Sequence, residues 1–189
     1  MGKLVVLSLF SALAADLHPE QKKRLAVIDM EDYSGVVRKT AEYFSEINFT
    51  APEGYMERGI YALKQYYAVA MLDPANAHAV SRPVDPFWHA HILHTEQYVE
   101  FCNRVVGEYM HHRPLNHGNE DHVAVIRRLY RYTLDVLPKL FNVVDNNFWT
   151  KDIPDEMLIC WHKGNQEIYR ELQPMRLFEP NERGVGYLA

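Results

Sequence analysis

The stretch of sequence that decides the fold is residues 85–107, which read DPFWHAHILHTEQYVEFCNRVVG. Asp85 and Pro86 are typical of a helix start, because an aspartate caps free amides and proline suits the first helical position. Gly107 is typical of a helix end, where the chain adopts a left-handed conformation. The sequence therefore predicts one continuous helix over residues 86–106.

Helical periodicity continues on both sides of this stretch. It predicts helices over residues 19–47 (with a bend near Gly35), 53–72, 119–139 and 154–172. Residues 73–85 are expected to form a loop, and the chain from about residue 174 an irregular tail. No alternation of polar and apolar residues is long enough to predict a strand. We therefore expect an all-α fold, a single-domain irregular helical bundle of about five to seven helices over residues 1–189.

Composition excludes several classes of protein. The 189 residues carry 20 Lys+Arg against 25 Asp+Glu, so no basic excess is present to bind nucleic acid. Hydrophobic residues make up 48%, which excludes wholesale disorder. Two cysteines exclude a scaffold built on disulfides, and both are expected to be reduced. No apolar run is long enough to span a membrane.

The N-terminal segment supports two interpretations. Lys3 precedes an apolar run over residues 4–15, which is typical of a short secretory signal. The alternative is a buried N-terminal helix. We expect a cytoplasmic protein, or a secreted one if residues 1–14 act as a signal peptide.

Histidines point to a site, because seven of the ten lie between residues 89 and 122. On the predicted helix His91 and His94 are about 60° apart, with Tyr98 and Cys102 on the same stripe. His89 points about 160° away from His91 and could join them only if the first turn were distorted. His18 and His78, outside the cluster, are expected to be solvent-exposed.

A loop rich in histidine follows Gly107, which is expected to turn the chain back beside its own helix. Imidazole is the commonest protein ligand for transition metals. The sequence therefore predicts a site for iron, zinc or copper, in which Tyr98 donates a hydrogen bond or a proton. The candidate ligands are His91, His94 and at least one of His111, His112 and His117, with His89 as a further candidate.

The His-rich motif, residues 84–118, resembles the glycine-rich domain-containing protein-like family. The hallmark of that family is Asp-x-x-Trp-His-x-His followed by Tyr and Cys, with His-His-x-Pro after a Gly in its short bacterial members. The specific match covers about residues 82–118, and a looser one continues through residues 120–121, 129–130, 133 and 148–149. The matching residues here are Asp85, Trp88, His89, His91, Tyr98, Cys102, Gly107, His111, His112 and Pro114.

This resemblance implies an intracellular, mostly helical module and no particular reaction. Two positions depart from the family pattern. His94 stands where relatives often carry Asp, another metal ligand, and His117 stands where an aromatic or small residue is usual.

Two functions are open on these observations. The first is a His-ligated metalloenzyme, hydrolytic or oxidative, acting on a small molecule or a peptide. The second is a non-catalytic helical interaction module in which the histidines and Trp88 are structural. In that case Tyr61, Tyr66 and Tyr67 would form a surface for a protein partner.

Overall fold

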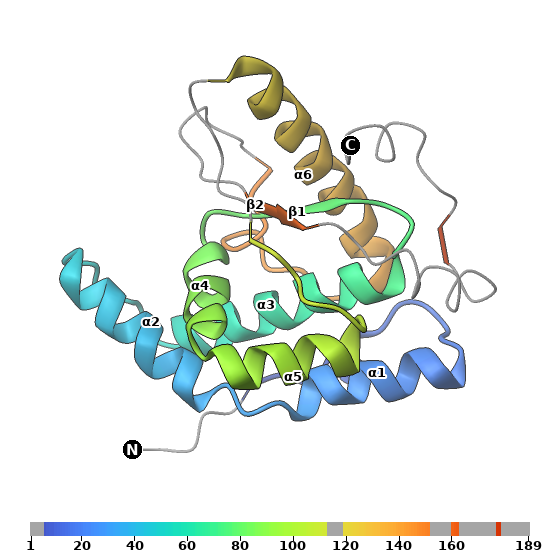
Figure 1. Cartoon of the computed structure of the whole chain (residues 1–189), viewed down its shortest axis with the longest axis horizontal. Coiled ribbons are helices and arrows are strands. Elements are labelled where there is room, and N and C mark those ends of the chain that lie inside the picture. Colours follow the sequence, from blue (N-terminus) through green and yellow to red (C-terminus); the bar gives the residue numbers. More distant parts are fainter. Residues whose placement is uncertain (1–5, 113–118, 152–159, 163–176, 179–189) are drawn as a thin grey trace.

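The fold is a bundle of helices with one short pair of strands (Figure 1). The computed structural model describes residues 6–112, 119–151, 160–162 and 177–178. Within these residues the expected all-α class is confirmed. The elements are η1 (Leu9–Ala12), α1 (Pro19–Met30), α2 (Ser34–Glu46), α3 (Tyr55–Leu72), β1 (His78–Val80), α4 (Asp85–Leu93), α5 (Thr95–Val105), α6 (Glu120–Leu140) and β2 (Cys160–His162).

Helix α3 forms the centre of the core, because every residue from Gly59 to Leu72 is buried. It contacts α1, α4 and α6, and α1 in turn packs beside α5 (Figure 1). Its two buried long polar side chains have partners, as buried polar groups require. Lys64 forms an ion pair of 3.0 Å with Asp29, and Gln65 donates to the Val143 carbonyl.

This burial overturns one expectation. Tyr61, Tyr66 and Tyr67 are at most 4% exposed, so they cannot form a partner surface. A helix that is hydrophobic on all sides packs inside a protein, and α3 is buried on every side from Gly59 to Leu72.

The predicted helix over residues 86–106 is wrong in one respect, because the chain breaks at His94 into α4 and α5. His94 has φ −86° and ψ 62°, outside the helical region. Its Nδ1 lies 2.8 Å from the Ala90 carbonyl oxygen, while its backbone amide donates to the His91 carbonyl. The imidazole thus occupies the carbonyl that a continuing helix would use, and α5 leaves in a new direction (Figure 1).

Two further expectations are wrong because two distant segments pair as strands, which neither segment predicts by itself. Residues 78–80 pair antiparallel with residues 160–162, where a loop and a helix were expected. The remainder of the helix predicted over 154–172 lies outside the described residues. His78 is fully buried rather than exposed, and its Nε2 lies 3.0 Å from an Asp73 carboxylate oxygen.

The start of the described chain packs against the core. Leu9 is buried, and Leu13 forms a bridge with Phe141 after α6. Only part of the segment is buried, since Leu7 and Phe10 are 54% and 41% exposed, and both the signal peptide and the compartment stay predictions. Within the part of the chain that the structure describes, no helix has both the length and the apolar character of a membrane span.

Candidate metal site

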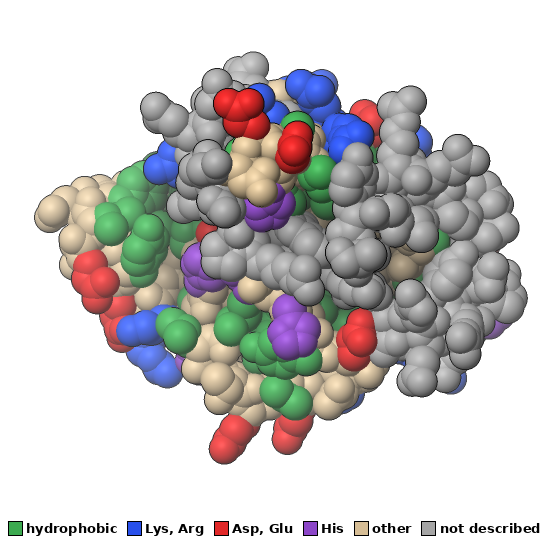
Figure 2. Space-filling view, turned by 45° about the horizontal axis from the view of Figure 1, so that its top comes forward, with side chains coloured by type: hydrophobic (Ala, Val, Ile, Leu, Met, Phe, Trp, Pro, Cys, Tyr) green, Lys and Arg blue, Asp and Glu red, His purple; other side chains and the backbone are tan. Residues whose placement is uncertain are grey.

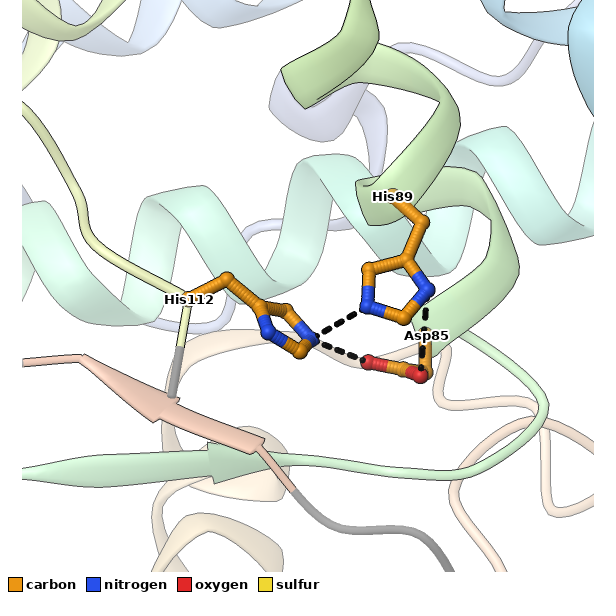
Figure 3. Close-up of side chains that lie close together, drawn as sticks. All are labelled: Asp85, His89 and His112. Carbon is orange, nitrogen blue, oxygen red and sulfur yellow. Dashed lines mark hydrogen bonds and ion pairs between the residues drawn. The ribbon is translucent and has the colours of Figure 1, made fainter. Parts of the chain in front are cut away.

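Three side chains with metal-ligating atoms converge at the start of α4 (Figure 3). They are Asp85, His89 and His112, and one ligand atom from each lies within 4.8 Å of the other two. The His112 Nε2 atom lies 3.1 Å from Asp85 Oδ1 and 2.6 Å from His89 Nε2. Among the described residues, these three form the one group of three or more His, Cys, Asp or Glu side chains with that geometry.

Helix α4 positions two of the three residues. Asp85 is its first residue and His89 follows four positions later, so both project from the same face of the first turn. The expectation that Asp85 caps the helix is wrong, because Val84 occupies the cap position. The Asp85 carboxylate instead faces both imidazoles, 3.6 Å from His89 Nδ1 (Figure 3).

The return of the chain after α5 positions His112. Gly107 has φ 81°, a left-handed conformation that glycine adopts at low cost, and its amide donates to the Cys102 carbonyl. The predicted turn back beside the helix is thus confirmed. The Tyr98 hydroxyl then donates to the Met110 carbonyl, two residues before His112. That same hydroxyl accepts a hydrogen bond from Trp88 Nε1, so a buried side chain of α4 holds the returning segment.

The three ligand atoms lie close to one another. A neutral imidazole nitrogen carries at most one hydrogen, and the single hydrogen on His112 Nε2 would have to serve both Asp85 and His89. A cation in the same place would accept a lone pair from each of the three residues. A four-coordinate zinc with bonds of about 2.1 Å separates its ligand atoms by roughly 3.3 Å. The separations of 2.6 Å and 3.1 Å from His112 Nε2 are shorter than that value, so the side chains would have to move slightly apart to hold an ion.

Burial and charge differ across the cluster. Asp85 is 4% exposed, the His112 side chain 11% and the His89 side chain 51%. Burial lowers the pKa of His89, an effect that the nearby Asp85 carboxylate opposes and His112 reinforces. His89 is therefore neutral at pH 7, which is the form that binds a metal.

A groove of about 920 Å³ opens beside the cluster, and Asp85, His89 and His112 are part of its lining. Its walls come mainly from α2, the segment after it and α4, and they are largely apolar. Figure 2 shows hydrophobic side chains gathered over α2 on the left, beside histidines near the centre. The size is that of a pocket for a small molecule.

The structure places His91 outside the cluster. It is completely buried, and its Nδ1 lies 2.8 Å from the Tyr67 hydroxyl. Burial, reinforced by His94, lowers the pKa of His91 to about 3. The rings of Tyr33, Tyr67, Tyr98 and Phe101 surround it, so it packs as part of the core.

The other predicted site residues that the structure describes, His112 and His89 apart, also lie outside the cluster. His94 contacts the Ala90 carbonyl at the helix break, and exposed His111 packs its ring on Tyr109. His117 lies outside the described residues. Tyr98 is fully buried with its hydroxyl bonded to Trp88 and Met110. Of the six histidines predicted as ligands, the described residues bring together His89 and His112. The assignment of the others as ligands, and of Tyr98 as catalytic, stays a prediction.

Asp85 is not among the ligands predicted from the sequence, because an aspartate just before Pro86 is typical of a helix cap. A signal was nevertheless present. Asp85 and His89 are four residues apart in a segment predicted to be helical, and this spacing places two side chains on one face. Comparing His89 with Asp85, rather than with His91, would have identified the pair.

Comparison with known proteins gives one family. No curated protein and no solved structure matches the chain. The model of the UCP032817-like family matches residues 23–136, which is more than half of the chain and includes Asp85, His89 and His112. The likeness of the His-rich motif to the glycine-rich domain-containing protein-like family stays a prediction. On the extent of the match, this chain belongs to the UCP032817-like family.

Proposed function

We propose that this protein binds one divalent transition metal ion through Asp85, His89 and His112, and that it is a metal-dependent enzyme. One observation carries the proposal: the three ligand atoms converge within 4.8 Å at the wall of an apolar groove. A structural site is usually closed by four protein ligands, whereas a catalytic site keeps a position open. Three ligands beside a groove correspond to the second arrangement.

The chemistry of the donor set narrows the choice of ion. Two imidazoles and one carboxylate are the ligands of zinc in one class of hydrolases and of ferrous iron in one class of oxygenases. A bound ion of either kind supplies a Lewis acid or a redox centre. Zinc would indicate a hydrolytic reaction, and iron or copper an oxidative one.

The chain's own residues have separate tasks in this proposal. Asp85 supplies negative charge in a nearly buried position, which offsets the charge of an ion there. Trp88 and Tyr98 hold His112 in place through the Met110 carbonyl. The partly exposed His89 lies where the cluster meets the groove and can adjust to the ion.

The test is the metal content of the untagged protein, because a polyhistidine tag would bind metal itself. The protein is stripped with a chelator and reconstituted with zinc, or with ferrous iron under anaerobic conditions. Elemental mass spectrometry counts the ions, and calorimetry gives the dissociation constant. We expect about one ion per chain, as a single three-residue site requires.

Variants assign the ligands. Asp85→Asn, His89→Ala and His112→Ala should each lower the affinity at least tenfold, because each removes a ligand. His111→Ala is the matched control, since its exposed neighbouring imidazole lies outside the cluster. His91→Ala and His94→Ala test the ligands expected from sequence and should retain the ion. A wild-type protein without metal after reconstitution would refute the proposal, as would loss of metal in His111→Ala alone.

A further inference from the structure

The groove beside the cluster has walls suited to an apolar chain. Phe44 forms part of its lining and is packed against Phe49, with ring centroids 4.8 Å apart. Ile47, Phe49 and Leu93 also line it and are between 40% and 63% exposed. Large apolar side chains exposed together are uncommon in a folded protein and mark a binding surface.

Most charged side chains that line the groove have a partner of opposite charge or an imidazole beside them, but one arginine has neither among the described residues. On α2, Lys39 forms an ion pair of 2.9 Å with Glu42, and Glu46 lies close enough to act on it as well. Asp85 faces two imidazoles. Arg82, three residues before Asp85, is exposed in the groove lining and forms no ion pair with any described residue. Its guanidinium is therefore available to a ligand.

We propose that the groove binds a small molecule with an apolar chain and a carboxylate, the carboxylate pairing with Arg82 and the chain lying against Ile47, Phe49 and Leu93. A guanidinium donates two parallel hydrogen bonds to the two oxygens of a carboxylate. A ligand that ends in an ammonium or a hydroxyl group lacks this pair of acceptor oxygens. Asp85 lines the same groove and disfavours a carboxylate at the metal-free cluster. The anionic end is thus directed to Arg82, and the chain is left beside His89 and His112.

This inference deepens the proposed function, since it names the class of substrate that the metal would act on. The two can nevertheless fail separately. Binding of the chain and the carboxylate needs no metal, so the test uses the full-length protein after removal of metal with a chelator.

The experiment is calorimetric titration with octanoate, decanoate and dodecanoate at pH 7.5, below their micelle concentrations. We expect the affinity to rise roughly fourfold per added methylene, the gain from burying one CH₂ group. Decanol and decylamine should bind about threefold to tenfold more weakly than decanoate, the range of a partly exposed charge-assisted pair. Equal binding of decanoate and decanol, or no binding of any chain, would overturn the inference.

Variants locate the two ends of the ligand. Arg82→Gln should weaken decanoate about threefold to tenfold and leave decanol unchanged, while Arg82→Lys should recover part of the loss. Arg131→Gln, an exposed arginine of α6 that does not line the groove, is the control. Leu93→Asp should weaken every chain, and its 63% exposure makes a folding defect a poor explanation.

A comparison of decanoate binding with and without metal separates this inference from the metal proposal. If decanoate bound only after metal was added, and Arg82→Gln did not weaken it, the carboxylate would be a metal ligand and the inference would be wrong. If decanoate bound the metal-free protein through Arg82 while no ion was retained, the inference would stand and the proposed function would fail.

Discussion

The Nε2 atoms of His89 and His112 lie 2.6 Å apart although 23 positions separate the two residues in the sequence. One belongs to the first turn of α4, and the other to the segment that returns after α5. Their contact depends on the break at His94 and on the left-handed turn at Gly107. The candidate metal site is therefore a product of how two helices and a loop are connected.

The hydroxyl of Tyr98 should be needed to position His112. Tyr98→Phe leaves the Trp88 indole N–H and the Met110 carbonyl without this buried partner, at a cost of about 1–3 kcal/mol in the free energy of unfolding. We also expect about tenfold weaker metal binding, the lower end of the range for residues that orient ligands. Urea denaturation and calorimetry measure the two effects.

Tyr132→Phe is the matched control for this variant. The Tyr132 hydroxyl also makes two hydrogen bonds, with Asp73 and Asn76, but it lies outside the cluster. It should lower stability without altering metal affinity. Equal affinity of Tyr98→Phe and wild type would show that Tyr98 only stabilises the fold.

Metal binding should weaken in acid, because protons compete with the ion for His89. His89 has a lowered pKa, so it stays neutral at a pH where an ordinary histidine is half protonated. We expect little change in affinity between pH 7.5 and about pH 6.5, and a fall of up to about tenfold per pH unit once His89 becomes protonated at lower pH. Competition with a chelating dye measures the metal affinity across this pH range. Affinity that stayed constant down to pH 5 would indicate that carboxylates alone bind the ion.

Gly59 should not tolerate a larger side chain. A Cβ atom added there would clash with the ring of Phe87, which is completely buried. Alanine would otherwise favour the helix by about 1 kcal/mol. Overpacking outweighs that gain, and we expect Gly59→Ala to lower the free energy of unfolding by about 1–3 kcal/mol.

A double-mutant cycle with Phe87→Leu checks the cause. Removing the ring should make Gly59→Ala less harmful, with a coupling of about 0.5–2 kcal/mol between the two positions. Strictly additive effects in urea denaturation would mean that the contact with Phe87 is not the source of the loss.

The thiol of Cys102 should be unreactive in the folded protein. It is fully buried, and burial raises its pKa to about 11. A raised pKa leaves the thiol protonated at pH 8, with about a hundredfold fewer thiolates than an ordinary cysteine. In a Cys160→Ser background, which removes the second cysteine, we expect a disulfide reagent to label Cys102 far more slowly in buffer than in urea. Similar rates in both would contradict the burial.

Local patterns in the sequence predicted much of the fold. The helical periodicity of α3, the helix that begins near residue 119 and the turn at Gly107 each depend on a few neighbouring residues, and each is found in the structure. The concentration of histidines around residues 89–112 is likewise a property of one short stretch. These features follow from hydrogen bonds and side-chain spacing within one turn or one helix.

Features that depend on distant segments were not predictable in this way. The strand at residues 78–80 exists because residues 160–162 pair with it, and the break at His94 occurs where α2 packs closely on α4. Which histidines meet also depends on packing. His91 faces the core and His89 the returning loop, because residues two apart on a helix project on nearly opposite sides.

The amino-acid sequence thus determined an all-helical chain with a cluster of metal-binding residue types, because both properties reside in short stretches. The choice of Asp85, His89 and His112 from that cluster came only with the packed molecule. The four-residue spacing of Asp85 and His89 places these two on one face of α4, but His112 reaches them only after α5 and the chain beyond Gly107 have packed against α4.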